Sequence, residues 1–100
     1  MTEDDLKKRT KLFALRILKL VAALPKTLAG RTIGGQLVRS GTSVAANYRA
    51  ACRARSKAEF ISRLGVVEEE ADESALLVGT NNRRRLDEEG ARRAFVGRGR

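Results

Sequence analysis

The recurrence of apolar side chains at the helical period constrains this chain more than any other feature. Drawn as an α-helix, residues 4–24 place most of their large apolar side chains within one arc about 100° wide. Residues 32–54 and 56–78 each carry a comparable stripe. Such a stripe must be buried against another helix, so the pattern predicts packed helices. The stripe of the first segment comprises Leu6, Phe13, Ile17, Leu20, Val21 and Leu24.

Composition supports the same fold class. Apolar residues make up 42% of the 100 residues but aromatics only 4%, so the core must be aliphatic. A sheet would be expected to contain more aromatic and β-branched residues. One hundred residues fit one domain. We therefore expect an all-α protein, an antiparallel up-down helical bundle of three long helices with a short or disordered fourth.

Local signals divide this bundle into its helices. The only proline, Pro25, ends the first helix at or before Leu24. We expect the second helix over about residues 32–54, although its glycines also allow a start near Gln36. Ser56 and Glu59 form a capping box that opens the third helix. The Gly-Thr-Asn-Asn stretch at residues 79–82 predicts its end. The bundle domain would then span 1–79, and the basic C-terminal segment 80–100 would form a short helix or be disordered.

The second helix also carries a regular polar seam. Its predicted core face is Ile33, Leu37, Gly41, Val44, Tyr48, Ala51 and Cys52. Beside this face lie four polar residues with the spacing i, i+4, i+7 and i+11. This spacing favours a helix–helix contact in which hydrogen bonds set the register, and the alternative is a seam that borders solvent. The seam comprises Gln36, Ser40, Ser43 and Asn47.

The charge distribution indicates a polyanionic partner. The chain has a net charge of +9, and residues 25–55 hold six basic residues and no acidic one. Such a segment suits RNA or another polyanion. The best candidates for phosphate contacts follow one line of the second helix and the turn after it. A solvated or subunit-bridging line is the alternative. These residues are Arg39, Arg49, Arg53, Arg55 and Lys57.

Catalytic and metal-binding patterns are missing from the sequence. It contains no histidine, which removes the commonest general base and most metal sites. The acidic cluster over residues 68–73 is expected to be a solvated face, or a docking surface for basic helices of another subunit. Scarce aromatics argue against stacking on RNA bases and favour recognition of backbone or shape. We predict a non-enzymatic protein with no cofactor, no metal and no small-molecule substrate.

The first helix carries a second apolar patch outside its stripe. This patch of Leu15, Leu18 and Ala22 predicts a second contact, with another helix or another subunit. Arg16 and Lys19 interrupt the apolar run of residues 12–24, which argues against a secretory signal or a membrane span. We therefore expect a cytoplasmic protein. Binding of the first helix to a membrane surface is a weaker alternative.

Residues 36–47 read Gln-Leu-Val-Arg-Ser-Gly-Thr-Ser-Val-Ala-Ala-Asn, and Arg55-Ser56-Lys57-Ala58-Glu59-Phe60 follows. These two motifs resemble the bacterial four-helix-bundle family called 23S rRNA-intervening-sequence proteins. The resemblance covers roughly residues 10–78. It implies an antiparallel bundle that forms a homo-oligomer, with ring-like pentamers the expectation, and possible RNA binding.

The sequence departs from the family pattern at two places. Ala50 stands where the family often has Glu, and after about residue 76 an Arg-rich, Gly-spaced stretch replaces the family's Leu- and aromatic-rich fourth helix. Without a full fourth helix, three helices would leave an apolar groove open. We therefore expect a stronger reliance on partners.

Overall fold

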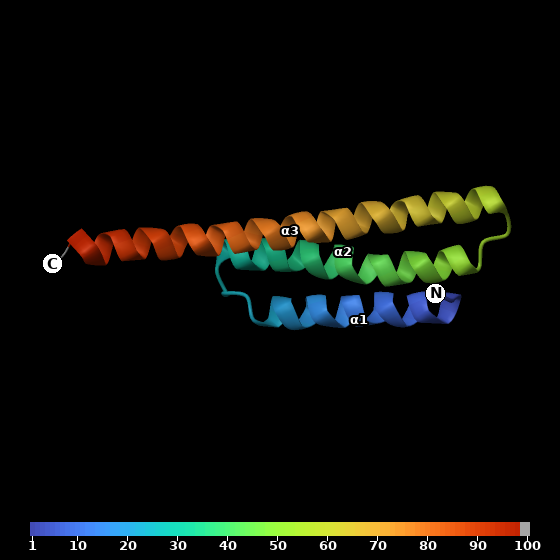
Figure 1. Cartoon of the computed structure of the whole chain (residues 1–100), viewed down its shortest axis with the longest axis horizontal. Helices are drawn as coiled ribbons and strands as arrows, with labels where there is room; N and C mark the ends of the chain where they lie inside the picture. Colours follow the sequence, from blue (N-terminus) through green and yellow to red (C-terminus); the bar gives the residue numbers. More distant parts are fainter. Residues whose placement is uncertain (99–100) are drawn as a thin grey trace.

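The chain folds into three helices arranged side by side (Figure 1). The structure is a computed structural model; it describes the backbone of residues 1–98 and the side chains of 1–87, 89–91 and 93–94. Helix α1 spans Glu3–Ala22, α2 spans Leu28–Cys52 and α3 spans Lys57–Arg98. Successive helices run antiparallel, and no strand occurs among the described residues. The prediction of an all-α up-down bundle with three long helices is confirmed.

Short polar side chains cap the first two helices. The Thr2 hydroxyl accepts from the Asp5 N–H at 3.2 Å, while the Thr2 N–H donates to the Asp5 carboxylate at 3.1 Å. Before α2, the Thr27 hydroxyl accepts from the Gly30 N–H at 3.1 Å. This cap starts α2 at Leu28. The expected start near residue 32, and the alternative near Gln36, are therefore wrong because an N-cap satisfies backbone N–H groups that a later start would leave exposed.

The predicted capping box opens α3. The Ser56 hydroxyl accepts from the Glu59 N–H at 3.1 Å. The Glu59 carboxylate reaches back and accepts from the backbone N–H of Arg55, also at 3.1 Å. The Ser56 hydroxyl thus satisfies a backbone donor of the first turn, whereas Glu59 reaches one residue further back than the N-cap that a standard capping box would use. The start of the third helix is confirmed.

Helix α2 lies between the other two helices and supplies most of the core. Helices α1 and α3 both pack on α2, and within the described chain they do not pack on each other. The buried hydrophobic residues include one from α1 and four from α2, as the two predicted stripes indicated. Ile33 and Cys52, also predicted for the core, lie at its edge and are half-buried. The core residues are Ile17, Leu37, Val44, Tyr48 and Ala51.

Two glycines of α2 allow α1 to approach closely. A Cβ atom added at Gly41 would lie 2.9 Å from both Cγ1 and Cγ2 of Ile17. At Gly34 it would lie 3.1 Å from Cγ1 of Val21. Contacts this short are well inside normal carbon–carbon separations. The close packing of α1 therefore offsets the helix propensity that these glycines cost.

Helix α3 continues through the stretch where the sequence predicted its end. Residues 79–82 are helical, and α3 reaches Arg98 as one helix of 42 residues. Asn81 is buried, with 7% of its surface exposed. A helical Gly costs only about 1 kcal/mol relative to Ala, so packing of this segment can outweigh it. The predicted turn is wrong, and the expected short fourth helix is the C-terminal part of α3. Residues 99 and 100 of the basic segment lie outside the described residues.

The last turns of α3 extend past the N-terminal end of α2 (Figure 1). A hydrogen bond of 2.8 Å between the hydroxyls of Ser40 and Ser74 fixes the register of these antiparallel helices. Leu28, the first residue of α2, is therefore level with about Leu86. Helix α2 covers the apolar residues of α3 only in part: Ile61, in the predicted stripe, is 57% exposed, and Leu86, beyond it, is 58% exposed.

Candidate nucleic-acid interface

Four of the five predicted phosphate-binding residues gather at the turn between α2 and α3. Arg49 and Arg53 are four residues apart, in the last turn of α2 and at its C-cap, and share a helix face. Arg55 lies in the turn, and Lys57 is the first residue of α3. All four are exposed. We call this group the turn cluster.

The turn cluster is not neutralised by ion pairs within the described part of the chain. Among the described residues, no ion pair includes any of its four side chains. The nearest acidic residue in sequence, Glu59, uses its carboxylate to accept from the backbone N–H of Arg55. Guanidinium groups bind phosphate oxygens through two parallel hydrogen bonds, and an ammonium binds them as a point charge. The cluster can therefore hold phosphate groups of an extended polyanion.

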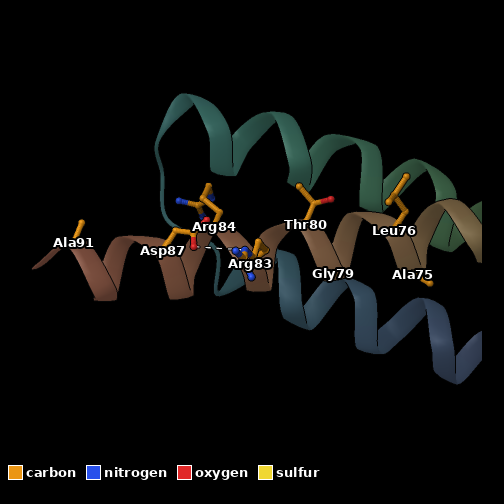
Figure 2. A pocket seen from close by; sticks show the side chains of 8 residues that line it. All are labelled: Ala75, Leu76, Gly79, Thr80, Arg83, Arg84, Asp87 and Ala91. Carbon is orange, nitrogen blue, oxygen red and sulfur yellow. Dashed lines mark ion pairs between the residues drawn. The ribbon is translucent and has the colours of Figure 1, made fainter. Parts of the chain in front are cut away.

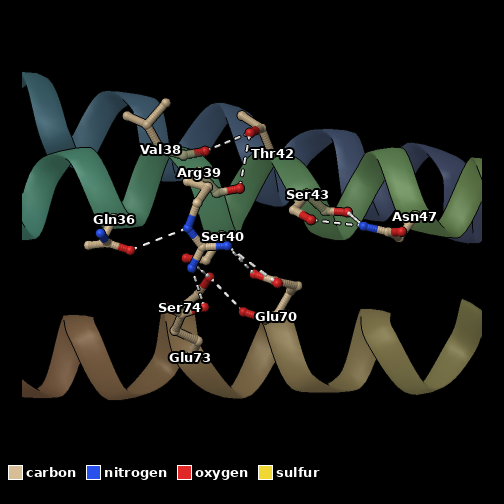
Figure 3. Close-up of polar contacts among 10 residues, drawn as sticks. All are labelled: Gln36, Val38, Arg39, Ser40, Thr42, Ser43, Asn47, Glu70, Glu73 and Ser74. Carbon is tan, nitrogen blue, oxygen red and sulfur yellow. Dashed lines mark hydrogen bonds and ion pairs between the residues drawn. The ribbon is translucent and has the colours of Figure 1, made fainter.

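Arg39, the fifth predicted residue, lies elsewhere and already has anionic partners. Its Nη1 lies 3.1 Å from Oε2 of Glu70, and its Nη2 pairs with the carboxylate of Glu73 (Figure 3). The Arg39 guanidinium lowers the pKa of Glu73. Arg39 is ten residues before Arg49, or about 15 Å along the helix. Its contribution to RNA binding stays a prediction, and we expect it to be smaller than that of the turn cluster.

Sequence reasoning did not find the partners of Arg39. The acidic stretch of α3 was expected to face solvent or another subunit, yet two of its carboxylates pair with α2 of the same chain. The sequence does place a basic residue, Arg39, on the neighbouring helix. Pairing it with Glu70 and Glu73, however, required knowledge of the register between α2 and α3. This ion pair remains partly open to solvent, since 48% of the Arg39 side chain is exposed.

The predicted polar seam crosses the helix contact at one residue. Ser40 is fully buried and hydrogen-bonds to Ser74 of α3 (Figure 3). The Asn47 amide instead donates to the carbonyl and hydroxyl of Ser43, at 2.9 and 2.8 Å, within α2. The exposed Gln36 accepts from Nε of Arg39 at 3.3 Å. Among the hydrogen bonds of the seam in the described part of the chain, that of Ser40 is therefore the one that links two helices.

A second group of basic side chains lies near the other end of α3. Arg83, Arg85 and Arg93 are exposed. Arg83 pairs with Asp87 at 3.5 Å, which partly neutralises it. Arg83 follows Lys57 by 26 residues, so about 39 Å of helix separates this group from the turn cluster. The sequence analysis noted this basic C-terminal segment, but the predicted phosphate-binding residues did not include any of it.

The described residues offer little to other kinds of site. Within them, the acidic side chains and Cys52 form no group of three that could hold a metal ion. None of the helices, as far as they are described, combines the length and apolar character needed to cross a membrane. The exposed basic turn cluster is thus the strongest candidate for a functional site.

Residues 3–92 match the family described as 23S rRNA-intervening sequence protein. The chain belongs to this family. The match extends beyond the resemblance expected over residues 10–78, so the sequence after residue 76 departs less from the family than predicted. No functionally curated protein matches the chain.

A solved structure gives the same assignment. It is a crystal structure of a protein of unknown function from the S23 ribosomal protein family of Bacteroides thetaiotaomicron. The two chains share 33% sequence identity, and the TM-score is 0.69. The similarity covers 83% of this chain and 74% of that one. The sequence and the fold therefore point to the same family.

Proposed function

We propose that this 23S rRNA-intervening sequence family member is a non-enzymatic protein that binds RNA through the turn cluster. The observation that carries the proposal is the set of four exposed basic side chains at one turn, with no ion pair among the described residues to neutralise them. The family's link to 23S rRNA supports RNA as the polyanion. Such a role would place the protein in the bacterial cytoplasm.

The proposed contact is with the RNA backbone or with its shape. Sequence-specific recognition of single-stranded RNA usually needs exposed aromatic rings on which bases stack. Here Tyr48 is buried, and Phe13 is half-buried. Phe60, which is 39% exposed, is the remaining aromatic residue whose side chain is described. Binding would therefore depend mainly on phosphate contacts and would weaken steeply as salt is raised.

The test measures RNA binding of the full chain, freed of bound nucleic acid, across a salt series. The probes are a 23S rRNA fragment and an unrelated RNA of equal length. We expect Arg49→Ala combined with Arg53→Ala to weaken binding. The slope of log affinity against log salt should fall by about one per lost phosphate contact, or about two in total.

A matched control removes the same charge at another place. Lys26, in the turn between α1 and α2, and Arg31, in the first turn of α2, are both exposed. Replacing both by Ala should leave the slope nearly unchanged. If this control lowers the slope as much as the Arg49/Arg53 variant does, binding depends only on net charge and the proposed site is wrong. Equal affinity for the two RNAs would indicate backbone binding without preference for rRNA.

A second candidate function is a structural module that assembles with copies of itself, in the ring-like pentamers expected for the family. The observation that favours it is the exposure of leucines on α1: Leu12 is 54%, Leu15 51% and Leu18 41% exposed. The expected second contact of this helix, predicted from Leu15, Leu18 and Ala22, is not made within the described chain. Light scattering of the full chain across a concentration series tests this function, and a monomer at every concentration would refute it.

A further inference from the structure

One face of α1 is turned away from the core and combines leucine with lysine. Ile17, on the opposite side of the helix, is buried against Gly41 of α2. Three leucines and three lysines lie on the outward side, and all six are exposed. Such a face is too apolar to be explained by solvation alone. This α1 outer face comprises Lys8, Lys11, Leu12, Leu15, Leu18 and Lys19.

The outward side of α3 has the opposite charge. Glu70 and Glu73 pair with Arg39. Three other acidic residues of the same stretch are exposed and take part in no ion pair among the described residues. One turn further lies Leu76, which is 68% exposed. We call Glu68, Glu69, Asp72 and Leu76 the α3 outer face.

The surface of α3 leaves room for another helix next to this face. From Leu76 and Gly79 an open groove of about 860 Å³ continues along α3 toward Arg83 and the C-terminal end of the helix (Figure 2), so α1 of a second copy would reach only its beginning. A Cβ atom added at Gly65 or Gly79 would meet nothing within 4 Å. In contrast to Gly34 and Gly41, no contact among the described residues accounts for these two helical glycines.

The two outer faces also lie at the same height along the bundle. Ile17 touches Gly41, and the neighbouring Ser40 bonds to Ser74, so Ile17 and Ser74 are nearly level. Helices α1 and α3 run in the same direction (Figure 1). Counting back from this level puts Glu68 and Asp72 beside about Lys11 and Leu15. Two copies placed side by side would thus bring Lys11 close to Glu68, and Leu15 close to Asp72, without a shift along the helices.

We propose that the α1 outer face of one copy docks on the α3 outer face of a second copy. This inference rests on the self-assembly function proposed above, not on RNA binding. A second copy fits better than a lipid surface because the acidic α3 outer face complements the lysines of α1. Since the two faces differ, the contact is head-to-tail, and it would close into a ring if the rotation between copies allows.

A reciprocal charge exchange tests the contact, with assembly measured by light scattering and analytical ultracentrifugation. One variant carries Lys8→Glu and Lys11→Glu, and the other carries Glu69→Lys and Asp72→Lys. Each alone should raise the dissociation constant for self-association about tenfold or more, because like charges would meet. Mixing the two should restore association, since each contact between the two variants again joins opposite charges. A ring with an odd number of copies cannot alternate throughout, so the mixture should form open or even-numbered complexes.

Controls separate this inference from general charge effects and from the RNA proposal. Lys26→Glu with Arg31→Glu changes the net charge as the first variant does, but away from both faces, and should assemble like the parent. Leu15→Gln should weaken assembly without a charge change. Variants that assemble like the parent, a mixture that stays dissociated, or a monomeric parent would each overturn the inference. None of these results would change the smaller salt dependence of RNA binding expected for the Arg49/Arg53 variant, so the two proposals can fail separately.

Discussion

Replacing Gly41 by Ala tests whether close packing of α1 on α2 holds the bundle together. The new Cβ would lie 2.9 Å from Cγ1 and Cγ2 of Ile17 and 3.0 Å from its Cβ. Carbon atoms prefer about 3.5–4.0 Å, so one helix must move by roughly 0.5–1 Å. Ile17 is 5% exposed and β-branched, and so cannot easily rotate away. Overpacking of this kind costs about 1–3 kcal/mol.

The matched control is Gly35→Ala in the same helix. At Gly35 the new Cβ would meet nothing within 4 Å. Both substitutions gain about 1 kcal/mol of helix propensity, so the difference between them isolates the contact with Ile17. We expect Gly35→Ala to stabilise the protein by up to about 1 kcal/mol. Gly41→Ala should be about 1–3 kcal/mol less stable than Gly35→Ala.

Urea unfolding followed by circular dichroism at 222 nm measures both variants. For a domain of this size, the difference corresponds to roughly 4–8 °C in melting temperature per kcal/mol. The measurements must share one protein concentration, because self-assembly would add to apparent stability. If Gly41→Ala is as stable as Gly35→Ala, the close approach of Ile17 does not limit the packing and the reasoning is refuted.

Three other predictions concern hydrogen bonding and titration. The Ser74 hydroxyl donates to the Glu70 carbonyl at 3.0 Å and therefore accepts the hydrogen bond from Ser40. Ser74→Ala should lower the free energy of unfolding by about 1–3 kcal/mol, because it leaves the buried Ser40 hydroxyl without this partner, and Ser40→Ala should lower it by about 0.5–1.5 kcal/mol. The double variant should lose less than the sum of the two. Additive costs in urea unfolding would contradict this coupling. Because Arg39 lowers the pKa of Glu73 below its usual 4.5, their stabilisation should be present above pH 4.5 and lost as pH falls through that lowered pKa. Urea unfolding at pH 7 and pH 3 should show the stability gap between parent and Arg39→Ala shrinking in acid, and a constant gap would count against the pair. Burial raises the pKa of Tyr48, the only tyrosine, to about 12, so its absorbance should titrate well above pH 10. Folding stability should then fall as pH rises from about 10 through 12, and a midpoint near 10 in the folded protein would contradict the burial.

Much of the fold could be predicted from the sequence because its signals are local. The helical period marked the buried faces of α1 and α2, and Ser56 with Glu59 marked the start of α3. The turn cluster also followed from local order, since Arg49, Arg53 and Lys57 surround one short connection. Residues this close in sequence are close in space whatever the tertiary arrangement.

Other features depended on contacts between distant residues. The stop signals at residues 79–82 are worth only about 1 kcal/mol at the glycine, too little to end a helix against packing. The use of Arg39 in an ion pair required α3 to place Glu70 and Glu73 across from it. Nothing near Arg39 in the sequence distinguishes it from Arg49, which has no such partner in the described chain.

The sequence by itself therefore determined the helical class, the core faces and the basic turn, because periodicity, caps and charge act over a few residues. Only the tertiary structure decided the register, which depends on side chains such as Ser40 and Ser74 that are 34 residues apart. That register also places the basic α1 outer face and the acidic α3 outer face at one height, on two helices that do not pack on each other in the described part of the chain. Each face is visible in the sequence, but their alignment exists only after α2 has packed between them.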